Sequence, residues 1–401
     1  MFRALYTTFI LLALLGDARI FLFILNRFVF GNHRTEKSPY GWLMFAVPPL
    51  LLGLTLLFWP LSTWIDRLMS ARVLEAIEPQ RMEEIAWSIV LAKLGAGWLT
   101  IAASVGIYWI VDRIRIVTHP DAPLAGIVDM EPDVVRLRRA HLPFPIVQKL
   151  GGHNDVYDIE VTRHEVFVDD LPPSCDGYRI AFLTDTHVAS FVRRDFYREI
   201  VAHTNAFEPD LVLFGGDFVT FARHIQLAAK VLTDGLRAGE GMYAVRGNHD
   251  YWAGIADVER ELGARGVEFL NNRSVQLRGV LPLVGIDEIY RGTPDVARAF
   301  ASVDPAQPCI GISHHPDIID LLPDRRLDLL LAGHTHGGQI RLPFFGPIVV
   351  PSAHEAEYAA GFHRQRDVLL YVSRGIGAIP PLRILCRPEV ALFTLRRGRR
   401  A

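Results

Sequence analysis

Charge-free apolar runs near the N-terminus constrain this chain more than any other feature. Residues 40–65 carry no charged side chain, and residues 85–111 carry only Lys93. Each run is long enough to cross the hydrocarbon core of a bilayer, which takes about 20 apolar residues. Tryptophans lie toward the ends of both runs, where an amphipathic ring prefers the membrane interface. We therefore predict two transmembrane helices here.

A further apolar stretch covers residues 4–25 and is interrupted by Asp17 and Arg19. We interpret it as a first span, because a cleavable signal peptide would have a small-residue cleavage site and no second span so close behind. The alternative, a set of buried helices in a large soluble domain, is disfavoured because charge-free runs of this length are rare in soluble cores. The sequence thus predicts a helical transmembrane domain over residues 1–112, with spans at 4–25, 40–65 and 85–111.

Residues 113–155 alternate between basic and acidic stretches and are predicted to be a linker. Three spans place the basic loop with Arg27 and Arg34 on the same side of the membrane as Arg113 and Arg115. Positively charged loops favour the cytoplasmic side. The sequence therefore predicts a multi-pass protein of the inner membrane whose C-terminal domain faces the cytoplasm.

The overall charge is nearly balanced, with 42 Lys and Arg against 44 Asp and Glu and a formal net charge of −2. This balance gives no sign of a nucleic-acid-binding surface, so no nucleic-acid partner is expected. Cys175, Cys309 and Cys386 are isolated and odd in number. They form neither a disulfide framework nor a CxxC metal pair, which is consistent with a reducing compartment.

After Asp155 the sequence changes to an α/β rhythm, in which short aliphatic runs alternate with amphipathic stretches. Buried strands are predicted within residues 178–185, 210–217, 241–248, 281–287, 308–316 and 327–336. Helices are predicted within residues 193–207 and 256–266. Ligands gather beyond the carboxyl ends of strands in α/β sheets. The polar residues that end these runs are therefore candidates for a single site.

Five polar clusters follow the predicted strands, and they offer carboxylates, imidazoles and one amide but no cysteine. They are Asp185 with His187, Asp217, Asn248 with His249 and Asp250, His314 with His315, and His334 with His336. Taken singly, each is typical of a turn, a helix cap or an exposed loop. Their coincidence at strand ends favours a metal centre with nitrogen and oxygen ligands, which suits Mn²⁺, Fe or Zn²⁺. The ligands are too many for one ion, so we predict two ions that share a carboxylate.

The ordered motifs D-x-H, G-D, G-N-H-D, S-H and G-H-x-H resemble those of the calcineurin-like metallophosphoesterase superfamily, over about residues 155–397. "GHTHGGQIRLP", "YVSRGIG" and "RPEVALFTL" further resemble the bacterial membrane-associated branch that includes the YkuE and YaeI types. The resemblance implies an α/β fold, a calcineurin-like β-sandwich flanked by helices, for the catalytic domain at residues 156–401. Many members of that branch have a further span just before the phosphoesterase domain, which this chain lacks.

The resemblance also implies a role for each residue of the clusters. Asp185, His187 and His336 would hold the first metal, Asn248, His314 and His334 the second, and Asp217 would bridge them. The glycines beside His334 and His336 would let the loop turn between the two ions. His249 would give a proton to the leaving oxygen, Asp250 would orient His249, and His315 lies outside the ligand set. Two divalent ions are thus expected, with manganese first and zinc or iron as alternatives.

These features together predict a membrane-anchored dinuclear-metal phosphoesterase that hydrolyses a phosphate ester with metal-activated water. The expected substrate is a phosphorylated lipid or a lipid-linked nucleotide, because a membrane-bound enzyme gains most from a substrate in the same layer. Membrane lipids are the expected partners. One alternative is a UDP-2,3-diacylglucosamine pyrophosphatase of lipid A synthesis. The others are a non-catalytic metal-binding scaffold and a transporter with a regulatory phosphoesterase domain.

Overall fold

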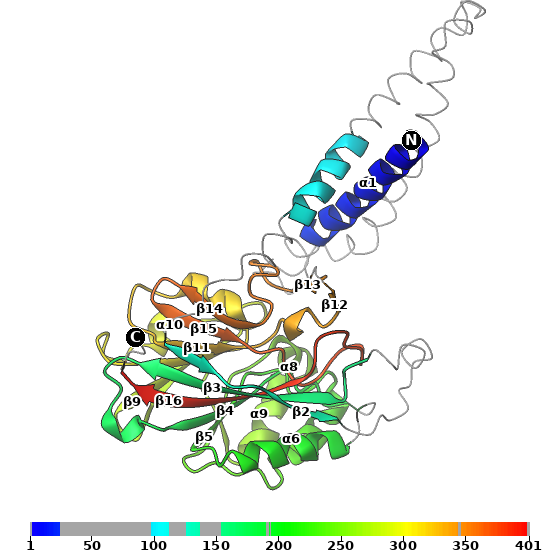
Figure 1. Ribbon diagram of the computed structural model, residues 1–401. Coiled ribbons are helices and arrows are strands. Elements are labelled where there is room, and N and C mark those ends of the chain that lie inside the picture. The colour runs from blue at the N-terminus through cyan, green and yellow to red at the C-terminus, as the bar shows by residue number, and fades with distance from the viewer. Residues whose placement is uncertain are drawn as a thin grey trace, which may run out of the picture. The chain divides into compact units, whose positions relative to one another are not determined.

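The computed structural model describes residues 2–24, 98–111, 126–136, 154–189, 192, 194–343 and 346–398. The chain divides into two compact units, Met1–Pro120 and Asp121–Ala401. Every strand within the described residues belongs to the second unit (Figure 1).

The first unit contains the helix α1 (Phe2–Ile24) and a helical segment over residues 98–111. Small residues bring these two helices into close contact. A Cβ added to Gly106 would lie 3.2 Å from the backbone nitrogen of Gly16, and one added to Gly16 would overlap the carbonyl group of Ala102. Several large apolar side chains on the same two helices are exposed, namely Leu11, Ile101, Ile107, Tyr108 and Val111.

Within the described residues, no helix has both the length and the apolar content that a membrane crossing requires. Helix α1 occupies the position of the expected span at 4–25, but it contains Arg3, Asp17 and Arg19. The expected span at 40–65 lies outside the described residues, and only 98–111 of the expected span at 85–111 is described. The transmembrane domain expected over residues 1–112 therefore stays a prediction.

The larger sheet of the second unit has eight strands in the order β1-β3-β16-β4-β5-β6-β7, and β2 also pairs with β3. Its strands are β1 (Ile127–Asp129), β2 (Asp133–Arg136), β3 (Asp158–Val168), β4 (Arg179–Leu183), β5 (Leu211–Phe214), β6 (Met242–Ala244), β7 (Val267–Phe269) and β16 (Glu389–Arg397). Strands β4 to β7 run parallel to one another. Their carboxyl ends therefore lie at the same edge of the sheet.

The smaller sheet has six strands in the order β14-β15-β11-β10-β9-β8. Its strands are β8 (Arg273–Leu277), β9 (Leu281–Ile286), β10 (Ile310–Ser313), β11 (Leu329–Ala332), β14 (Gly361–Gln365) and β15 (Val368–Val372). Strands β9, β10, β11 and β15 are parallel. A separate hairpin pairs β12 (Arg341–Leu342) with β13 (Gly346–Pro347).

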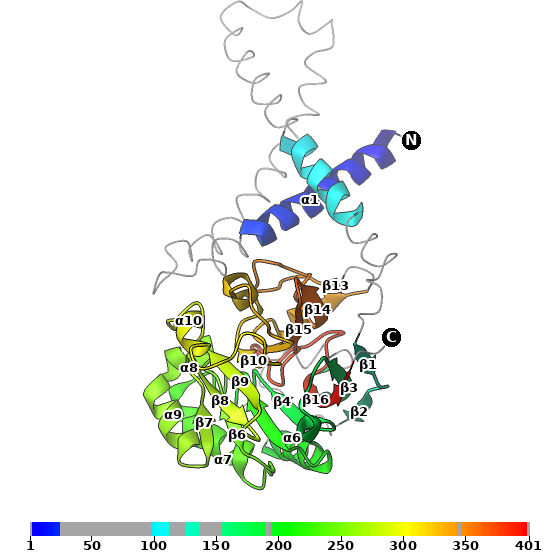
Figure 2. The ribbon, with the colours of Figure 1, turned by 90° about the vertical axis from the view of Figure 1, so that its left-hand side faces the viewer.

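Alternation of side chains along the buried strands produces four layers. In β4, Ile180 and Phe182 belong to the core shared by the two sheets, whereas Ala181 and Leu183 belong to the core under the helices of the larger sheet. Those helices are α6 (Arg194–Ala206), α7 (Ile225–Thr233) and α9 (Ile255–Gly263), seen together in Figure 2. The short helix α10 (Val296–Ala299) and the 3-10 turn η6 (Pro316–Leu321) cover the smaller sheet. The second unit is thus the expected sandwich of sheets flanked by helices.

Strands lie at all six predicted positions, and α6 and α9 lie at the two predicted helices. The expected linker at 113–155 is corrected in part, because residues 126–136 form β1 and β2 and pair with β3. These strands have only three and four residues and are largely exposed. They therefore lack the buried apolar run by which the other strands can be recognised.

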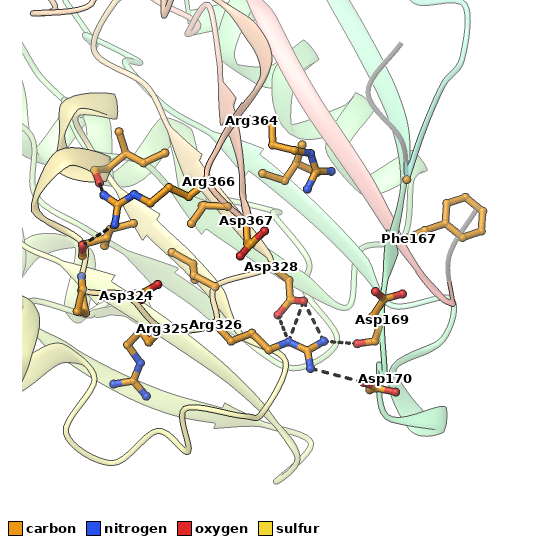
Figure 3. Close-up of a pocket in the computed structure, with 17 residues that line it drawn as sticks. Phe167, Asp169, Asp170, Asp324, Arg325, Arg326, Asp328, Arg364, Arg366 and Asp367 are labelled. Carbon is orange, nitrogen blue, oxygen red and sulfur yellow. Dashed lines mark hydrogen bonds and ion pairs between the residues drawn. The ribbon is translucent and has the colours of Figure 1, made fainter. Parts of the chain in front are cut away.

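A cavity of about 720 Å³ adjoins the beginnings of β11 and β15 (Figure 3). Arg326 lies 3.0 Å from Asp328 and 3.6 Å from Asp170, and Arg366 donates to backbone carbonyls of η6 and the residue after it. Arg326 and Arg366 are therefore engaged with carboxylates or with the backbone. The cavity therefore adjoins the amino end of β11, whose carboxyl end carries His334 and His336.

Candidate metal centre

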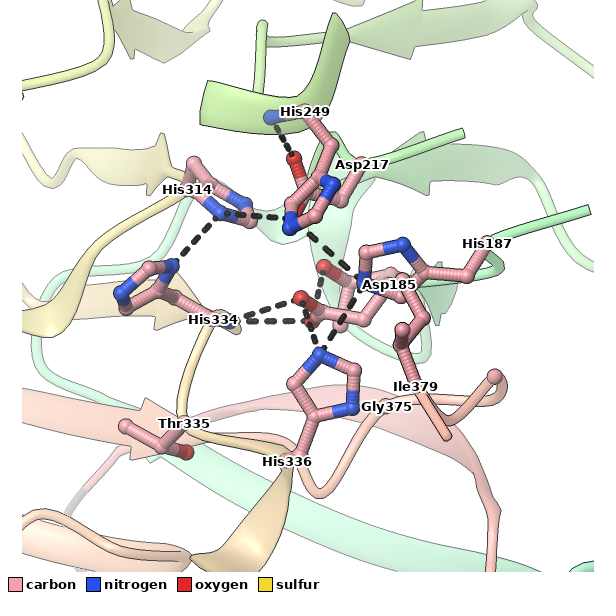
Figure 4. A network of polar contacts seen from close by, with 12 residues as sticks. Asp185, His187, Asp217, His249, His314, His334, Thr335, His336, Gly375 and Ile379 are labelled. Carbon is pink, nitrogen blue, oxygen red and sulfur yellow. Dashed lines mark hydrogen bonds and ion pairs between the residues drawn. The ribbon is translucent and has the colours of Figure 1, made fainter. Parts of the chain in front are cut away.

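The structure brings together all seven residues that the sequence suggests as metal ligands. Each one follows the carboxyl end of a parallel strand: Asp185 and His187 follow β4, Asp217 follows β5, Asn248 follows β6, His314 follows β10, and His334 and His336 follow β11. The parallel strands of both sheets therefore deliver their polar residues to one place (Figure 4). Within it, donor atoms gather in two groups that match the expected metal sites, and a third group overlaps both.

The first group consists of Asp185, His187 and His336, whose ligand atoms lie within 4.8 Å of one another. The Nε2 atoms of His187 and His336 are 3.0 Å apart. Nε2 of His336 also lies 3.5 Å from Oδ1 of Asp185. Two imidazole nitrogens and a carboxylate oxygen thus converge on one point.

The second group consists of Asp217, His314 and His334, again within 4.8 Å. Nε2 of His314 lies 3.0 Å from Nδ1 of His334 and 3.0 Å from Oδ1 of Asn248. The amide oxygen of Asn248 therefore completes this group, as the sequence suggests.

Asp217 lies between the two groups. Its Oδ2 atom is 3.5 Å from Nε2 of His187 and 3.4 Å from Nε2 of His314. One carboxylate oxygen is therefore near a ligand of each group. This is the position that a bridging ligand requires.

The protonation states of the histidines favour metal binding. Burial holds the pKa of His187 and His334 well below its usual range and lowers the pKa of His336 to about 3. These imidazoles are therefore neutral near pH 7, and each retains a nitrogen lone pair. Two lone pairs 3.0 Å apart, as on His187 and His336, repel each other unless a cation or a proton lies between them.

The charges around Asp217 also favour the binding of a metal ion. Burial would raise its pKa, but the charges of His314 and His249 hold it well below its usual range. Burial lowers the pKa of His314, but the charge and hydrogen bond of Asp217, with the charges of Asp185 and Glu288, together raise it to about 10. Positive charge is thus favoured beside Asp217, and a divalent cation bound there would supply it. The nitrogen and oxygen donors suit Mn²⁺, Zn²⁺ or Fe.

Five of the seven ligand residues have a left-handed backbone. The φ angles are 52° for Asp185, 43° for His187, 53° for Asp217, 68° for His334 and 52° for His336. Residues other than glycine adopt this conformation rarely and at a cost, and such residues concentrate at functional sites. In the 333–338 turn, this backbone carries one histidine into each donor group.

His249 forms the third group with His187 and Asp217, within 4.8 Å, although it lies outside the ligand set expected from the sequence. It lies on α8 (Asn248–Ala253), its ring centroid is 4.7 Å from that of His187, and its backbone N–H donates to Oδ1 of Asp217. Its pKa is lowered, chiefly by burial.

The hydrogen bonds of Asp250 differ from the expectation that this residue orients His249. Its described hydrogen bonds come from three backbone N–H groups, those of Asp217, Phe218 and Gly247, at 2.8, 2.9 and 3.0 Å. Burial and the Asp217 charge raise its pKa to about 8, whereas the three donors favour its carboxylate form. Asp250 thus holds the loop that carries the bridging carboxylate.

His315 supports the centre from outside the donor groups. His315 is fully buried, and its ring centroid lies 4.1 Å from that of His334. Its Nδ1 accepts from the backbone N–H of Asp317, so its Nε2 carries the hydrogen and donates to the carbonyl of Pro351. His315 is outside both donor groups, in line with the sequence interpretation, but it packs against a ligand.

Arg383 was not identified from the sequence, where it stands alone in an apolar segment. It is fully buried and donates to the carbonyls of His336, Arg374, Gly375 and Gly377. It thereby ties the turn of His336 to the loop that follows β15. Arg246, a conceivable phosphate ligand, instead lies 2.7 Å from Glu259 and 3.5 Å from Asp287.

Comparison with known proteins agrees with this geometry. The sequence model of the family described as calcineurin-like phosphoesterase matches residues 178–338. The chain is 31% identical to the uncharacterized metallophosphoesterase YkuE of Bacillus subtilis over 248 residues, which is 59% of this chain and 86% of YkuE. It is 30% identical to the phosphodiesterase YaeI of Escherichia coli, over 59% of this chain and 88% of YaeI.

A more distant relative is the UDP-2,3-diacylglucosamine pyrophosphatase LpxG of Chlamydia muridarum, 27% identical over 54% of this chain and 83% of LpxG. The donor groups include the aspartates and histidines of the D-x-H, G-D, S-H and G-H-x-H motifs. The alignments with YkuE and YaeI cover most of the length of each relative. The chain is a metal-dependent hydrolase and belongs to the calcineurin-like phosphoesterase family.

Proposed function

We propose that this protein is a membrane-anchored phosphoesterase with two metal ions, and that it hydrolyses a phosphorylated lipid or a lipid-linked nucleotide. The observation that carries the proposal is the position of Asp217 Oδ2, at 3.5 Å from His187 and 3.4 Å from His314. A single carboxylate so placed can join two cations at the short spacing that phosphoryl-transfer sites use, roughly 3.5–4 Å.

Asp185, His187 and His336 would hold one ion, Asn248, His314 and His334 the other, and Asp217 both. When bound, such a pair supplies Lewis-acid charge against the phosphate and lowers the pKa of water toward about 7. The residues of the chain contribute a preorganised frame, because five of the ligands are fixed by a left-handed backbone. We propose manganese as the metal, with zinc and iron as alternatives.

His249 is the proposed proton donor to the leaving oxygen. Its ring is next to His187, and its backbone N–H is anchored on Asp217 at 2.8 Å. A well-placed acid contributes roughly 10²–10⁴-fold to such a reaction. Asp250 is a positioning residue, because it fixes the backbone of Asp217, Phe218 and Gly247.

Anchoring in the membrane rests on the first unit and on the apolar sequence around it. Small residues at Gly16, Ala102 and Gly106 allow close helix contact, as is common between membrane helices. Leu11, Ile101 and Tyr108 are exposed, which costs little where lipid surrounds the helices. The charge-free run at 40–65 adds a segment of spanning length.

The substrate proposal follows from that anchoring. An enzyme and a substrate confined to the same thin layer meet far more often than they would in solution. The name of the relative LpxG refers to a lipid-linked nucleotide, which supports the alternative of a UDP-2,3-diacylglucosamine pyrophosphatase for this chain. The alternative of a non-catalytic scaffold is disfavoured, because each ligand position is filled by a residue able to bind metal.

The proposal is tested with the full chain in detergent, loaded with Mn²⁺ or Zn²⁺. We expect hydrolysis of bis(p-nitrophenyl) phosphate, and a higher kcat/KM for a phosphorylated lipid in mixed micelles than for its water-soluble headgroup. Equal or better turnover of the soluble headgroup, with the lipid ignored, would contradict the lipid substrate. Failure to cleave any phosphate ester with either metal would contradict the phosphoesterase itself.

Sidedness is tested separately. The bias of basic residues favours a cytoplasmic catalytic domain. A reporter fused after Ala401 is therefore expected to be active only when it functions in the cytoplasm. Activity restricted to a reporter that works outside the membrane would reverse the proposed orientation.

A further inference from the structure

Trp252 is an exposed aromatic residue directly beside the proposed proton donor. It lies one turn after His249 on α8, and the two ring centroids are 4.5 Å apart at an interplanar angle of 78°. More than half of Trp252, 56%, is exposed to solvent. A large indole left open next to a catalytic group has not been buried for packing, so it is available to contact a ligand.

An arginine from another part of the chain accompanies this indole. Cζ of Arg291 lies 5.2 Å from the centroid of the Trp252 ring. A guanidinium at this distance from an aromatic face is held in place by cation–π attraction. The same guanidinium group is well shaped to bind phosphate oxygens.

The loop that carries Arg291 is rigidly built. The carboxylate of Glu288, fully buried, accepts from the backbone N–H groups of Tyr290 and Arg291 at 2.8 and 2.5 Å. The neighbouring carboxylate of Asp287 accepts from the hydroxyl of Tyr251 at 2.8 Å. Because Tyr251 precedes Trp252, this bond fastens the loop to α8. The Trp252–Arg291 pair is therefore preorganised, which lowers the entropic cost of binding a ligand.

We propose that Trp252 and Arg291 form a subsite for the leaving group, and that this group is a nucleoside monophosphate. The subsite adjoins His249, which faces the leaving oxygen, so whatever it binds is on the leaving side of the scissile bond. A flat ring that stacks on the indole and a phosphate that pairs with the guanidinium are the two parts of a nucleotide. The inference rests on the proposed phosphoesterase function and narrows its substrate to a lipid-linked nucleotide. Water forms the new P–O bond at the lipid-side phosphorus, the P–O bond to the nucleotide phosphate breaks, and the nucleoside monophosphate leaves.

Inhibition by product fragments tests this directly. With the Mn²⁺-loaded full chain and bis(p-nitrophenyl) phosphate as substrate, we expect UMP to inhibit more strongly than ribose 5-phosphate, by about tenfold for one stacked base. Trp252→Ala is expected to remove this difference, whereas Trp252→Phe, which keeps an aromatic face, retains most of it. Arg291→Gln is expected to weaken UMP and ribose 5-phosphate alike and to leave binding of uridine unchanged.

The chain offers a matched control. Phe221 is another exposed aromatic residue with an arginine over its ring, at 4.6 Å from Arg223, but its ring neighbour is His224 rather than His249. Phe221→Ala is expected to leave every inhibition constant unchanged. Equal inhibition by UMP and ribose 5-phosphate in the unmodified protein, or a UMP preference that survives Trp252→Ala, would overturn the subsite.

A second readout separates the subsite from the enzyme activity. Calorimetric titration with UMP and with ribose 5-phosphate measures binding whether or not any ester is cleaved. A tenfold preference for UMP that depends on Trp252, in a protein that cleaves no ester, would support the subsite and contradict the phosphoesterase. Hydrolysis without any such preference would support the phosphoesterase and contradict the subsite.

Discussion

Gly247 lies so close to Asp217 that no side chain fits between them. A Cβ added to Gly247 would be 2.7 Å from Cγ of Asp217 and would overlap both Oδ1 and the backbone nitrogen of that residue. The glycine thus lets the loop before α8 pack directly against the bridging carboxylate. The position of this carboxylate depends on a residue that is not itself a proposed metal ligand.

The first prediction follows from that contact. Gly247→Ala is expected to displace Asp217 and to lower kcat/KM by at least about 100-fold, as misplacement of a catalytic group by about 1 Å does. Gly263→Ala is the control, because an added Cβ there meets nothing within 4 Å and the residue ends a helix. A Gly247→Ala protein with unchanged activity and metal content would show that Asp217 is not held in this way.

Asp250 provides a second prediction, on positioning. Asparagine offers one acceptor oxygen in place of two, so Asp250→Asn leaves at least one of three buried N–H groups poorly paired. We expect metal affinity to fall about 10–100-fold, the usual effect of losing a residue that supports ligands. Asp257→Asn, on the exposed side of α9, is the control. Unchanged metal affinity together with an altered pH profile of kcat would instead show that Asp250 orients His249.

His249 is predicted to matter most when the leaving group is poor. His249→Asn is expected to lower kcat by about 10²–10⁴-fold for an alkyl phosphodiester. The loss should be much smaller for a p-nitrophenyl ester, whose leaving oxygen needs little protonation. Both proteins should retain two ions per chain. Loss of an ion in the variant would identify His249 as a ligand, since its ring lies within reach of His187 and Asp217.

A fourth prediction concerns stability in acid. Burial would raise the pKa of Glu389, but the charge of Arg374, 3.0 Å away, and hydrogen bonds lower it to about 2. Because the folded-state pKa is below the ordinary value, the carboxylate stabilises the fold above about pH 4.5, and this is lost as the pH falls toward 2. A pKa shift of this size contributes about 3 kcal/mol to the free energy of unfolding.

Glu389→Gln removes this pH-dependent stabilisation, because glutamine has no carboxylate. We expect the urea midpoint of the variant to be lower than that of the unmodified protein at pH 7, and the difference to shrink between pH 4.5 and pH 2. Glu208→Gln, at an exposed ion pair with Arg179, is the control and should shift the midpoint little. A difference between Glu389→Gln and the unmodified protein that is independent of pH would contradict the role of the Arg374 pair.

Much of the site could be predicted because it depends on topology. Asp185, Asp217 and His334 end strands that are buried on both faces, and such strands are recognisable as short aliphatic runs. Parallel strands bring their carboxyl ends to one edge, so these residues had to meet. The structure therefore brings the seven expected ligand residues to one place, and their assignment to two metals stays a proposal.

Other features depend on contacts that a sequence does not display. The fully buried Arg383 is held by backbone carbonyls, which leave no pattern of side chains to detect. The bonds of Asp250 also run to the backbone, so the sequence suggested its neighbour His249 instead. The loop at Glu288 brings Arg291 to Trp252 from 39 residues further along the chain, by hydrogen bonds that no motif marks.

The central claim is that Asp217 joins two metal ions, and the metal content of the purified protein tests it most directly. After saturation with Mn²⁺ and removal of free metal, elemental analysis is expected to find two ions per chain. Asp217→Asn, which keeps the shape of the side chain but removes its charge, is expected to hold fewer and to lose activity. One ion or none in the unmodified protein, or two ions in an active Asp217→Asn variant, would contradict the account.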